Sequence, residues 1–211
     1  MRDVPKRMRV ILLVGAGSLC LLGAQPSAEQ VLTNEPADLA KRLDREKLIV
    51  LEDVSSGGSE SFVIAYLIFE RRREEVIELL RLAERQTEYR PELDSVKTVR
   101  KLENGRIDEQ HLRILFTEIV YRLRYVDVPG SNRFDWKLDP DFDNDLRRME
   151  GFWELSAYHS DPNRTLARFG SNVDVGPAVP RVIQKGMSRR TVLRYLENCR
   201  RWIDSNGEWR P

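Results

Sequence analysis

The two histidines are the first residues to test for catalysis, because an imidazole is the commonest general base near neutral pH. His111 falls on the outward face of an expected strand, and His159 lies at a strand end beside a turn. Neither histidine comes with a glycine-flanked serine, and the chain has no Gly-rich phosphate loop, no CxxC pair and no HExxH motif. The sequence therefore contains no recognisable catalytic motif.

An acidic segment is the candidate for a metal site. Residues 139–145 (DPDFDND) place aspartates at positions 1, 3, 5 and 7 of the usual calcium loop, and Glu150 stands at position 12. However, Asn144 replaces the turn glycine, Arg147 takes a ligand position, and strands rather than helices are expected on both sides. We interpret the segment as a solvated connection between strands, and we predict no metal and no cofactor.

Aromatic side chains offer a different kind of site, a hydrophobic pocket. They fall on the inward parity of the expected strands, where ring faces supply contact area and tyrosine hydroxyls supply polar groups. Arg100 shares the parity of Val96 and Thr98, so in a regular strand it would point inward and pair with a ligand carboxylate or carbonyl. The same parity would also suit a solid core. The candidate ligand-binding residues are Phe116, Tyr121, Tyr125, Trp136, Trp153, Phe169 and Arg100.

These positions depend on an alternation of apolar and polar residues from about 95 to 176. Residues 133–138 (RFDWKL) show it most clearly. A period of two is typical of an antiparallel sheet with one wet and one buried face. Asn104-Gly105 predicts a hairpin turn, and a slip in phase within residues 117–120 predicts a bend or bulge inside a strand.

Three helices and an N-terminal hairpin complete the expected elements. The second strand of that hairpin is apolar on both parities, which predicts that both of its faces are covered. The last helix has one apolar stripe, interrupted at Gly186, where we expect a kink. The expected helices are 37–46, 70–86 and 179–205, and the expected hairpin strands are 48–54 and 61–69.

The N-terminus has the layout of a secretory signal peptide. Residues 1–9 carry four basic side chains, and residues 10–24 form an uncharged apolar run that is short for a membrane span. Cys20 follows a leucine, whereas lipid attachment requires a small residue there. We expect residues 1–24 to be cleaved and the protein to be periplasmic or secreted, with an uncleaved anchor as the alternative.

Composition narrows the class of the remaining chain. Removing residues 1–24 takes away four of the 35 basic and one of the 34 acidic residues, which leaves a net charge near −2 and no basic excess to suggest nucleic acid. Cys199 is then the single cysteine, and its apolar surroundings predict a buried thiol. We expect a lead-in over residues 25–47, one domain over 48–207 and a short tail over 208–211.

Five short motifs carry a resemblance to a known fold family: residues 89–93 (YRPEL), residues 151–155 (GFWEL), Arg164-Thr165, residues 174–176 (DVG) and Val179-Pro180. With the order of elements, they make the chain similar to the START-like (SRPBCC) superfamily, and more closely to its polyketide cyclase/dehydrase and coenzyme Q-binding branch. The resemblance covers about residues 48–205. It implies an α+β helix-grip fold, in which a curved antiparallel sheet wraps around a long C-terminal helix. It also implies a cavity for lipids, sterols, quinones or polyketides.

Three functional hypotheses follow. The first is an exported domain that binds a hydrophobic small molecule, such as a lipid, a quinone or a polyketide-like compound, with transient membrane contact left open. The second is a cyclase or aromatase on the same fold, for which Thr98, Glu118 or Arg100 would have to supply chemistry beside the tyrosines. The third is an interaction domain with a filled core. A cavity of several hundred Å³ would separate the first from the third.

Overall fold

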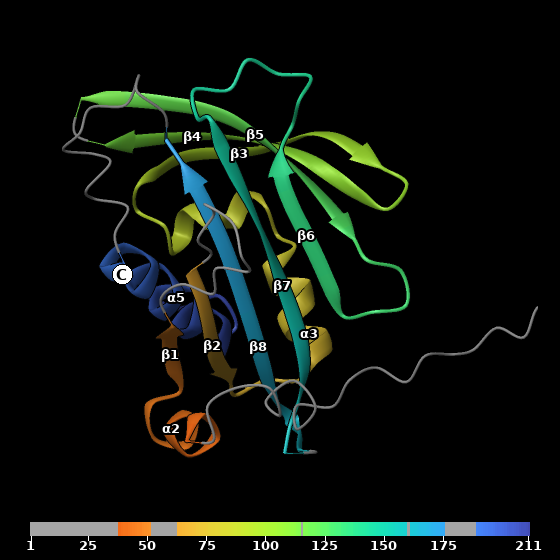
Figure 1. Cartoon of the computed structure of the whole chain (residues 1–211), viewed down its shortest axis with the longest axis vertical. Helices are drawn as coiled ribbons and strands as arrows, with labels where there is room; N and C mark the ends of the chain where they lie inside the picture. The colour runs from red at the N-terminus through yellow and green to blue at the C-terminus, as the bar shows by residue number, and fades with distance from the viewer. Residues whose placement is uncertain (1–37, 52–62, 115, 160, 176–188) are drawn as a thin grey trace, which may run out of the picture.

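The computed structural model describes residues 38–51, 63–114, 116–159, 161–175 and 189–211 (Figure 1). The predicted signal peptide, the turn at residues 55–60 and the kink at Gly186 lie outside these residues. Among the described residues, none of the helices has the length and apolar character that a membrane span requires. The described elements, in chain order, are α2 (Leu39–Glu46), β1 (Leu48–Leu51), β2 (Val63–Phe69), α3 (Arg73–Leu80), η1 (Glu84–Glu88), β3 (Leu93–Leu102), β4 (Gly105–Ile114), β5 (Thr117–Asp127), β6 (Arg133–Leu138), β7 (Arg148–Tyr158), β8 (Asp161–Asp174) and α5 (Arg189–Asp204).

The strands form one antiparallel sheet in the order β1-β2-β8-β7-β6-β5-β4-β3. After β2 the chain leaves the sheet through α3 and η1, starts again at the far edge with β3, and returns strand by strand until β8 pairs with β2. In Figure 1 the β3–β5 part crosses the β7–β8 part at a steep angle, so the sheet bends around α5. The predicted α+β helix-grip architecture is confirmed.

The inner face of the sheet packs against α5. The apolar stripe of this helix, Leu196, Cys199, Trp202 and Ile203, is fully buried. Their spacing places these four side chains on one helical face. Burial raises the pKa of the Cys199 thiol to about 12, so this cysteine is a packed thiol at neutral pH, as predicted.

The outer face of β1, β2 and β8 is covered by α2. Leu39 and Leu43 of the helix join Ile49, Tyr66 and Leu166 in a second apolar cluster. Six consecutive residues of β2 are therefore buried, which confirms that both faces of this strand are covered.

Two predicted elements differ from the structure. The phase slip at residues 117–120 is not a bulge within one strand, because Ile114 pairs with Thr117 and the chain reverses between β4 and β5. The expected helix over residues 70–86 is two elements, α3 and the 3-10 helix η1. In η1, Arg85 and Glu88 form a hydrogen-bonded ion pair three residues apart, and Glu88 also accepts a hydrogen bond from the indole of Trp202 (2.9 Å).

Candidate ligand-binding site

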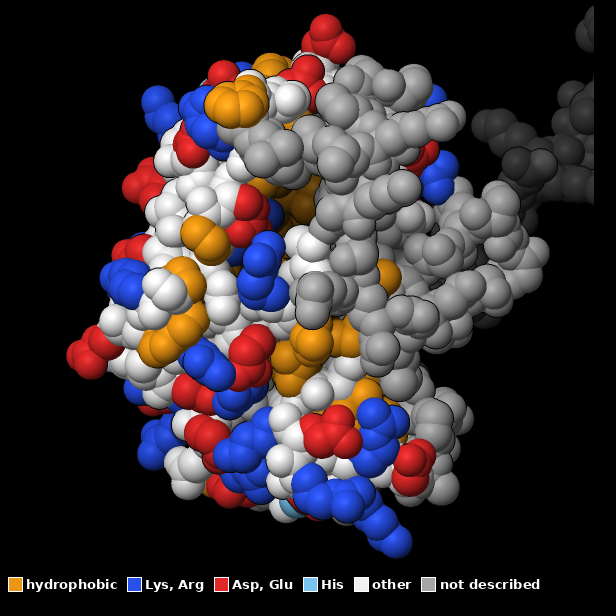
Figure 2. Space-filling view, turned by 90° about the vertical axis from the view of Figure 1, so that its left-hand side faces the viewer, with side chains coloured by type: hydrophobic (Ala, Val, Ile, Leu, Met, Phe, Trp, Pro, Cys, Tyr) orange, Lys and Arg blue, Asp and Glu red, His pale blue; other side chains and the backbone are white. Residues whose placement is uncertain are grey.

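A cavity of about 620 Å³ lies between the inner face of the sheet and α5. Its size is within the range of small-molecule sites in proteins. Figure 2 views the molecule from the side on which α5 lies and shows hydrophobic side chains inside a hollow, with charged side chains beside it. Side chains from the turn after η1, from β4 to β8 and from α5 line the cavity.

Aromatic rings from neighbouring strands form one wall of the cavity. The Phe169 ring centroid lies 4.8 Å from that of Trp153 and 5.6 Å from that of Trp136, and Trp136 continues the series to Tyr125 at 6.1 Å. Tyr195 of α5 also belongs to this wall, because its ring packs against Phe169 in an edge-to-face arrangement with the centroids 5.8 Å apart. These tilted arrangements are favourable for aromatic pairs. The wall is thus a continuous apolar surface shared by β5, β6, β7, β8 and α5.

Gly151 makes room for this wall. A Cβ atom at this position would lie 2.3 Å from Cζ2 of Trp136 and 2.3 Å from the carbonyl oxygen of Gly170. Gly151 pairs with Trp136 in the β6–β7 register, so the missing side chain lets the indole lie over the backbone of β7. The GFWEL motif therefore supplies both a wall residue, Trp153, and the space for its neighbour.

The cavity also has a polar wall, formed by Arg90, Tyr121 and Tyr125 and organised by the buried Gln110 of β4. The Tyr121 hydroxyl donates to Oε1 of Gln110 (2.8 Å), and Nε2 of Gln110 donates to the Tyr125 hydroxyl oxygen (3.3 Å). Nη1 of Arg90 also donates to Oε1 of Gln110 (3.4 Å). Burial raises the pKa of Tyr121, and it raises that of Tyr125 to about 12. Both phenols are therefore neutral at physiological pH and act as hydrogen-bonding groups.

Five of the seven predicted residues line the cavity together: Tyr121, Tyr125, Trp136, Trp153 and Phe169. Phe116 does not, because it lies at the reversal between β4 and β5, where its side chain is fully exposed.

Arg100 also lies outside the cavity. The β3–β4 register shifts between Thr98 and Arg100, and such an irregularity turns the following side chain to the other face. Arg100 is exposed instead, and its guanidinium lies 3.8 Å from the Asp141 carboxylate.

The sequence reasoning missed Arg90, Glu92 and Tyr195 as cavity residues, and Gln110 as the buried residue that holds the polar wall. Gln110 left a readable signal, since a polar residue on the parity of Leu112 is unusual for an apolar interior. Arg90 and Glu92 left none, because they belong to the turn before β3, where no periodicity applies.

The other polar candidates do not line the cavity and contact other residues instead. His111 lies between Glu118 (3.0 Å) and Glu109 (3.2 Å), and these two carboxylates raise its pKa. Glu118, named above as a cyclase candidate, is therefore a surface partner of His111. Thr98, another of the three cyclase candidates, donates its hydroxyl to the buried Asp108 (2.8 Å).

The acidic segment after β6 binds β5 rather than converging on a point. Asp139 is almost fully buried and pairs with Arg124 (2.7 Å). The side-chain oxygens of Asp145 and Asn144 accept the backbone N–H groups of Val120 and Arg122 (2.7 and 2.8 Å). Within the described part of the chain, no group of three or more His, Cys, Asp or Glu side chains is placed to hold a metal ion.

No protein-family model and no curated protein matches the sequence. Solved structures do match the fold. A START superfamily protein from Mycobacterium smegmatis aligns with a TM-score of 0.56 at 15% identity, over 68% of this chain and 97% of its own. The fold is START-like. A STAR-related lipid transfer protein from Xanthomonas axonopodis aligns over 75% of this chain and 94% of its own (TM-score 0.56, 14% identity). The Zhui aromatase/cyclase from Streptomyces sp. R1128 aligns over 68% and 93% (TM-score 0.55, 12% identity).

Proposed function

We propose that this START-like domain binds a hydrophobic small molecule in the cavity and shields it from water. The observation that carries the proposal is the cavity itself, about 620 Å³ with an aromatic wall and a small polar wall. An apolar wall with a few fixed polar groups is the usual design of a small-molecule site. Structural similarity to a lipid transfer protein and to an aromatase/cyclase supports the same ligand class.

The size of the cavity sets the scale of the interaction. At about 30 Å³ per atom, the share of a water molecule in the liquid, it holds about 20 non-hydrogen atoms. A ligand of this size contributes roughly −0.3 kcal/mol per atom, or about −6 kcal/mol in total, which corresponds to a Kd in the range of tens of micromolar. Closer shape complementarity between ligand and cavity would lower this Kd.

The two alternatives fit the structure less well. The described residues leave the interior open, which disfavours a domain with a filled core. A cyclase would need a general acid or base in the cavity. Among the described residues that line the cavity, Glu92 is the one carboxylate, and none is a histidine or a cysteine. We therefore propose binding without catalysis, in the polyketide cyclase/dehydrase and coenzyme Q-binding branch that the motifs resemble.

A cavity-filling substitution tests this function. Val192 of α5 is half-buried and lines the cavity, whereas its neighbour Leu193 is 43% exposed. We expect Val192→Trp to weaken binding of the neutral dye Nile red at least 10-fold, because the indole would occupy the space of the ligand. Leu193→Trp adds the same ring on the outside of the same helix and should bind the dye like the wild type. Equal binding by both variants would refute the proposal.

We also propose that the domain works outside the cytoplasm, after removal of residues 1–24. The support is the sequence pattern alone, a basic start followed by a short uncharged apolar run. Cell fractionation and determination of the N-terminal residue of the mature protein test it. A protein that keeps Met1 and remains in the cytoplasm would contradict it.

A further inference from the structure

The ionisable side chains that line the cavity are mainly positive. Among the described residues, they are the arginines Arg90, Arg113 and Arg194 and one carboxylate, Glu92. Asp94 pairs with Arg113 (Nε to Oδ2, 2.6 Å), so the region keeps one positive charge in excess when this carboxylate is counted. No ion pair of the exposed Arg194 is found within the described residues. The net charge around the cavity is thus positive, whereas the net charge expected for the mature chain is negative.

Arg90 is the most buried of these arginines, with only 13% of its side chain exposed. Its guanidinium lies over the Tyr195 ring, 5.2 Å from the centroid, between the sheet and α5. Nε donates to Glu92 (3.3 Å), and Nη1 donates to Gln86 (3.3 Å) and Gln110 (3.4 Å). The guanidinium also lies beside the Tyr121 hydroxyl, and its interaction with this hydroxyl opposes the effect of burial on the Tyr121 pKa. The cation is thus enclosed in the wall of a largely apolar cavity.

With these contacts, the Arg90 guanidinium can still form strong hydrogen bonds with a ligand. Hydrogen bonds to a charged donor are usually 2.7–2.9 Å long, so contacts at 3.3–3.4 Å are weak. Enclosing a cation is costly unless it is well paired, and the carboxylate partner of Arg90, Glu92, is itself 30% exposed to solvent. A planar guanidinium fork whose contacts are this long is suited to bind a carboxylate from a ligand.

We propose that the ligand is an ionised carboxylic acid, with its carboxylate on Arg90 and its apolar body against the wall formed by Trp136, Trp153 and Phe169. This inference rests on the proposed function and narrows the ligand class. The bound acid would be held between Arg90 and the neutral phenols of Tyr121 and Tyr125. The nearby Arg194 would favour entry of an anion, since attraction by exposed charges accelerates association.

The test compares two probes that differ only in the charged group, 9-anthracenecarboxylic acid and 9-anthracenemethanol. Their affinities for the mature protein are measured by fluorescence titration at pH 7.5. We expect the acid to bind about 10-fold more tightly than the alcohol. Arg90→Met should remove this preference and keep binding of the alcohol. Arg100→Met, which removes an exposed arginine outside the cavity, should keep the preference.

The outcomes separate this inference from the function on which it rests. Equal binding of both probes by the wild type overturns the carboxylate assignment and leaves the binding function standing. Absence of binding by either probe counts against both. If Arg90→Met does not fold, as shown by thermal unfolding, Arg90→Lys replaces it, because it keeps the charge and loses the fork. A reduced preference in this variant supports the assignment, and an unchanged one overturns it.

Discussion

Gln110 connects the two halves of the polar wall, because it accepts from Tyr121 and Arg90 and donates to Tyr125. Its side chain is completely buried, so each of these groups depends on the others for a partner. A buried network of this kind fixes the orientation of its members, since an unpaired polar group in such a place is costly. The wall therefore presents neutral hydroxyls and one cation in fixed positions.

Gly151 is the residue whose substitution should most directly disturb the aromatic wall. We expect Gly151→Ala to destabilise the protein by about 1–3 kcal/mol, because the new methyl group must displace the Trp136 ring or the Gly170 backbone. Urea unfolding followed by tryptophan fluorescence measures the change. Nile red binding should weaken as well. A variant as stable as the wild type would show that the close packing is not required.

His111 should make stability depend on pH. Hydrogen bonds to Glu118 and Glu109 raise its pKa above the ordinary value of 6.5, so the folded state binds the proton more tightly than the unfolded state. Its contribution is fully present below about pH 6.5 and is lost as the pH rises through the raised pKa. We expect the Tm of the wild type to fall over this interval more than that of His111→Gln. Glu118→Gln should also reduce the slope, and parallel profiles would contradict the assignment.

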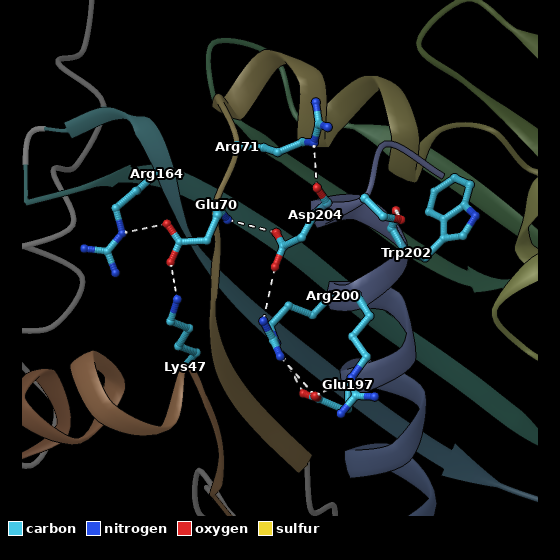
Figure 3. Close-up of polar contacts among 10 residues, drawn as sticks. Lys47, Glu70, Arg71, Arg164, Glu197, Arg200, Trp202 and Asp204 are labelled. Carbon is cyan, nitrogen blue, oxygen red and sulfur yellow. Dashed lines mark hydrogen bonds and ion pairs between the residues drawn. The ribbon is translucent and has the colours of Figure 1, made fainter. Parts of the chain in front are cut away.

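At the scale of elements, the C-terminal end of α5 is fixed to β2 and β8 by a polar network (Figure 3). Asp204 accepts the backbone N–H of Glu70 (2.9 Å) and pairs with Arg200 (3.1 Å). Glu70 in turn holds Lys47 and Arg164. Burial raises the pKa of Asp204, while the Glu70 amide and Arg200 oppose this rise. The network holds this end of the helix in place, while Val192 and Tyr195, nearer its start, line the cavity.

Removing Asp204 should loosen that attachment. We expect Asp204→Ala to cost about 1–3 kcal/mol, because the Glu70 N–H loses its partner and Arg200, which keeps Glu197, loses one of its two carboxylates. Asp204→Asn keeps an oxygen for the amide and should cost less. Urea unfolding of the two variants provides the comparison. Equal stability of Asp204→Ala and the wild type would contradict the role of the network.

The strands also explain why the alternation of inward and outward residues predicted most of the cavity residues. They explain as well why it was wrong for Arg100 and Phe116. The parts of β5 to β8 that carry the wall pair regularly, so Tyr121, Trp136 and Phe169 point inward as their positions predicted. A register shift in β3 turned Arg100 outward. The reversal before β5 carries no Gly, Asn or Asp, so no residue type there indicated that Phe116 would lie in a turn.

At the scale of the whole molecule, the fold was predictable because the two-residue period and the closing helix leave few packing solutions. The tyrosine hydroxyls of the cavity were predicted as well, but its charged side chains were not. Two of these charged residues, Arg90 and Glu92, lie in the turn before β3 that the fold brings under α5. Their positions also depend on the register of the strands, which the sequence alone does not set. The arrangement combines an apolar wall for affinity with a short polar wall for orientation.

Native mass spectrometry of the mature protein purified from its own host tests the central claim most directly. We expect an added mass that organic extraction releases as a hydrophobic molecule of about 20 non-hydrogen atoms, the number that the cavity volume accepts. The Val192→Trp protein should lack this mass, and Leu193→Trp should keep it. A wild-type protein that is empty when isolated and binds no apolar probe at millimolar concentration would contradict the account.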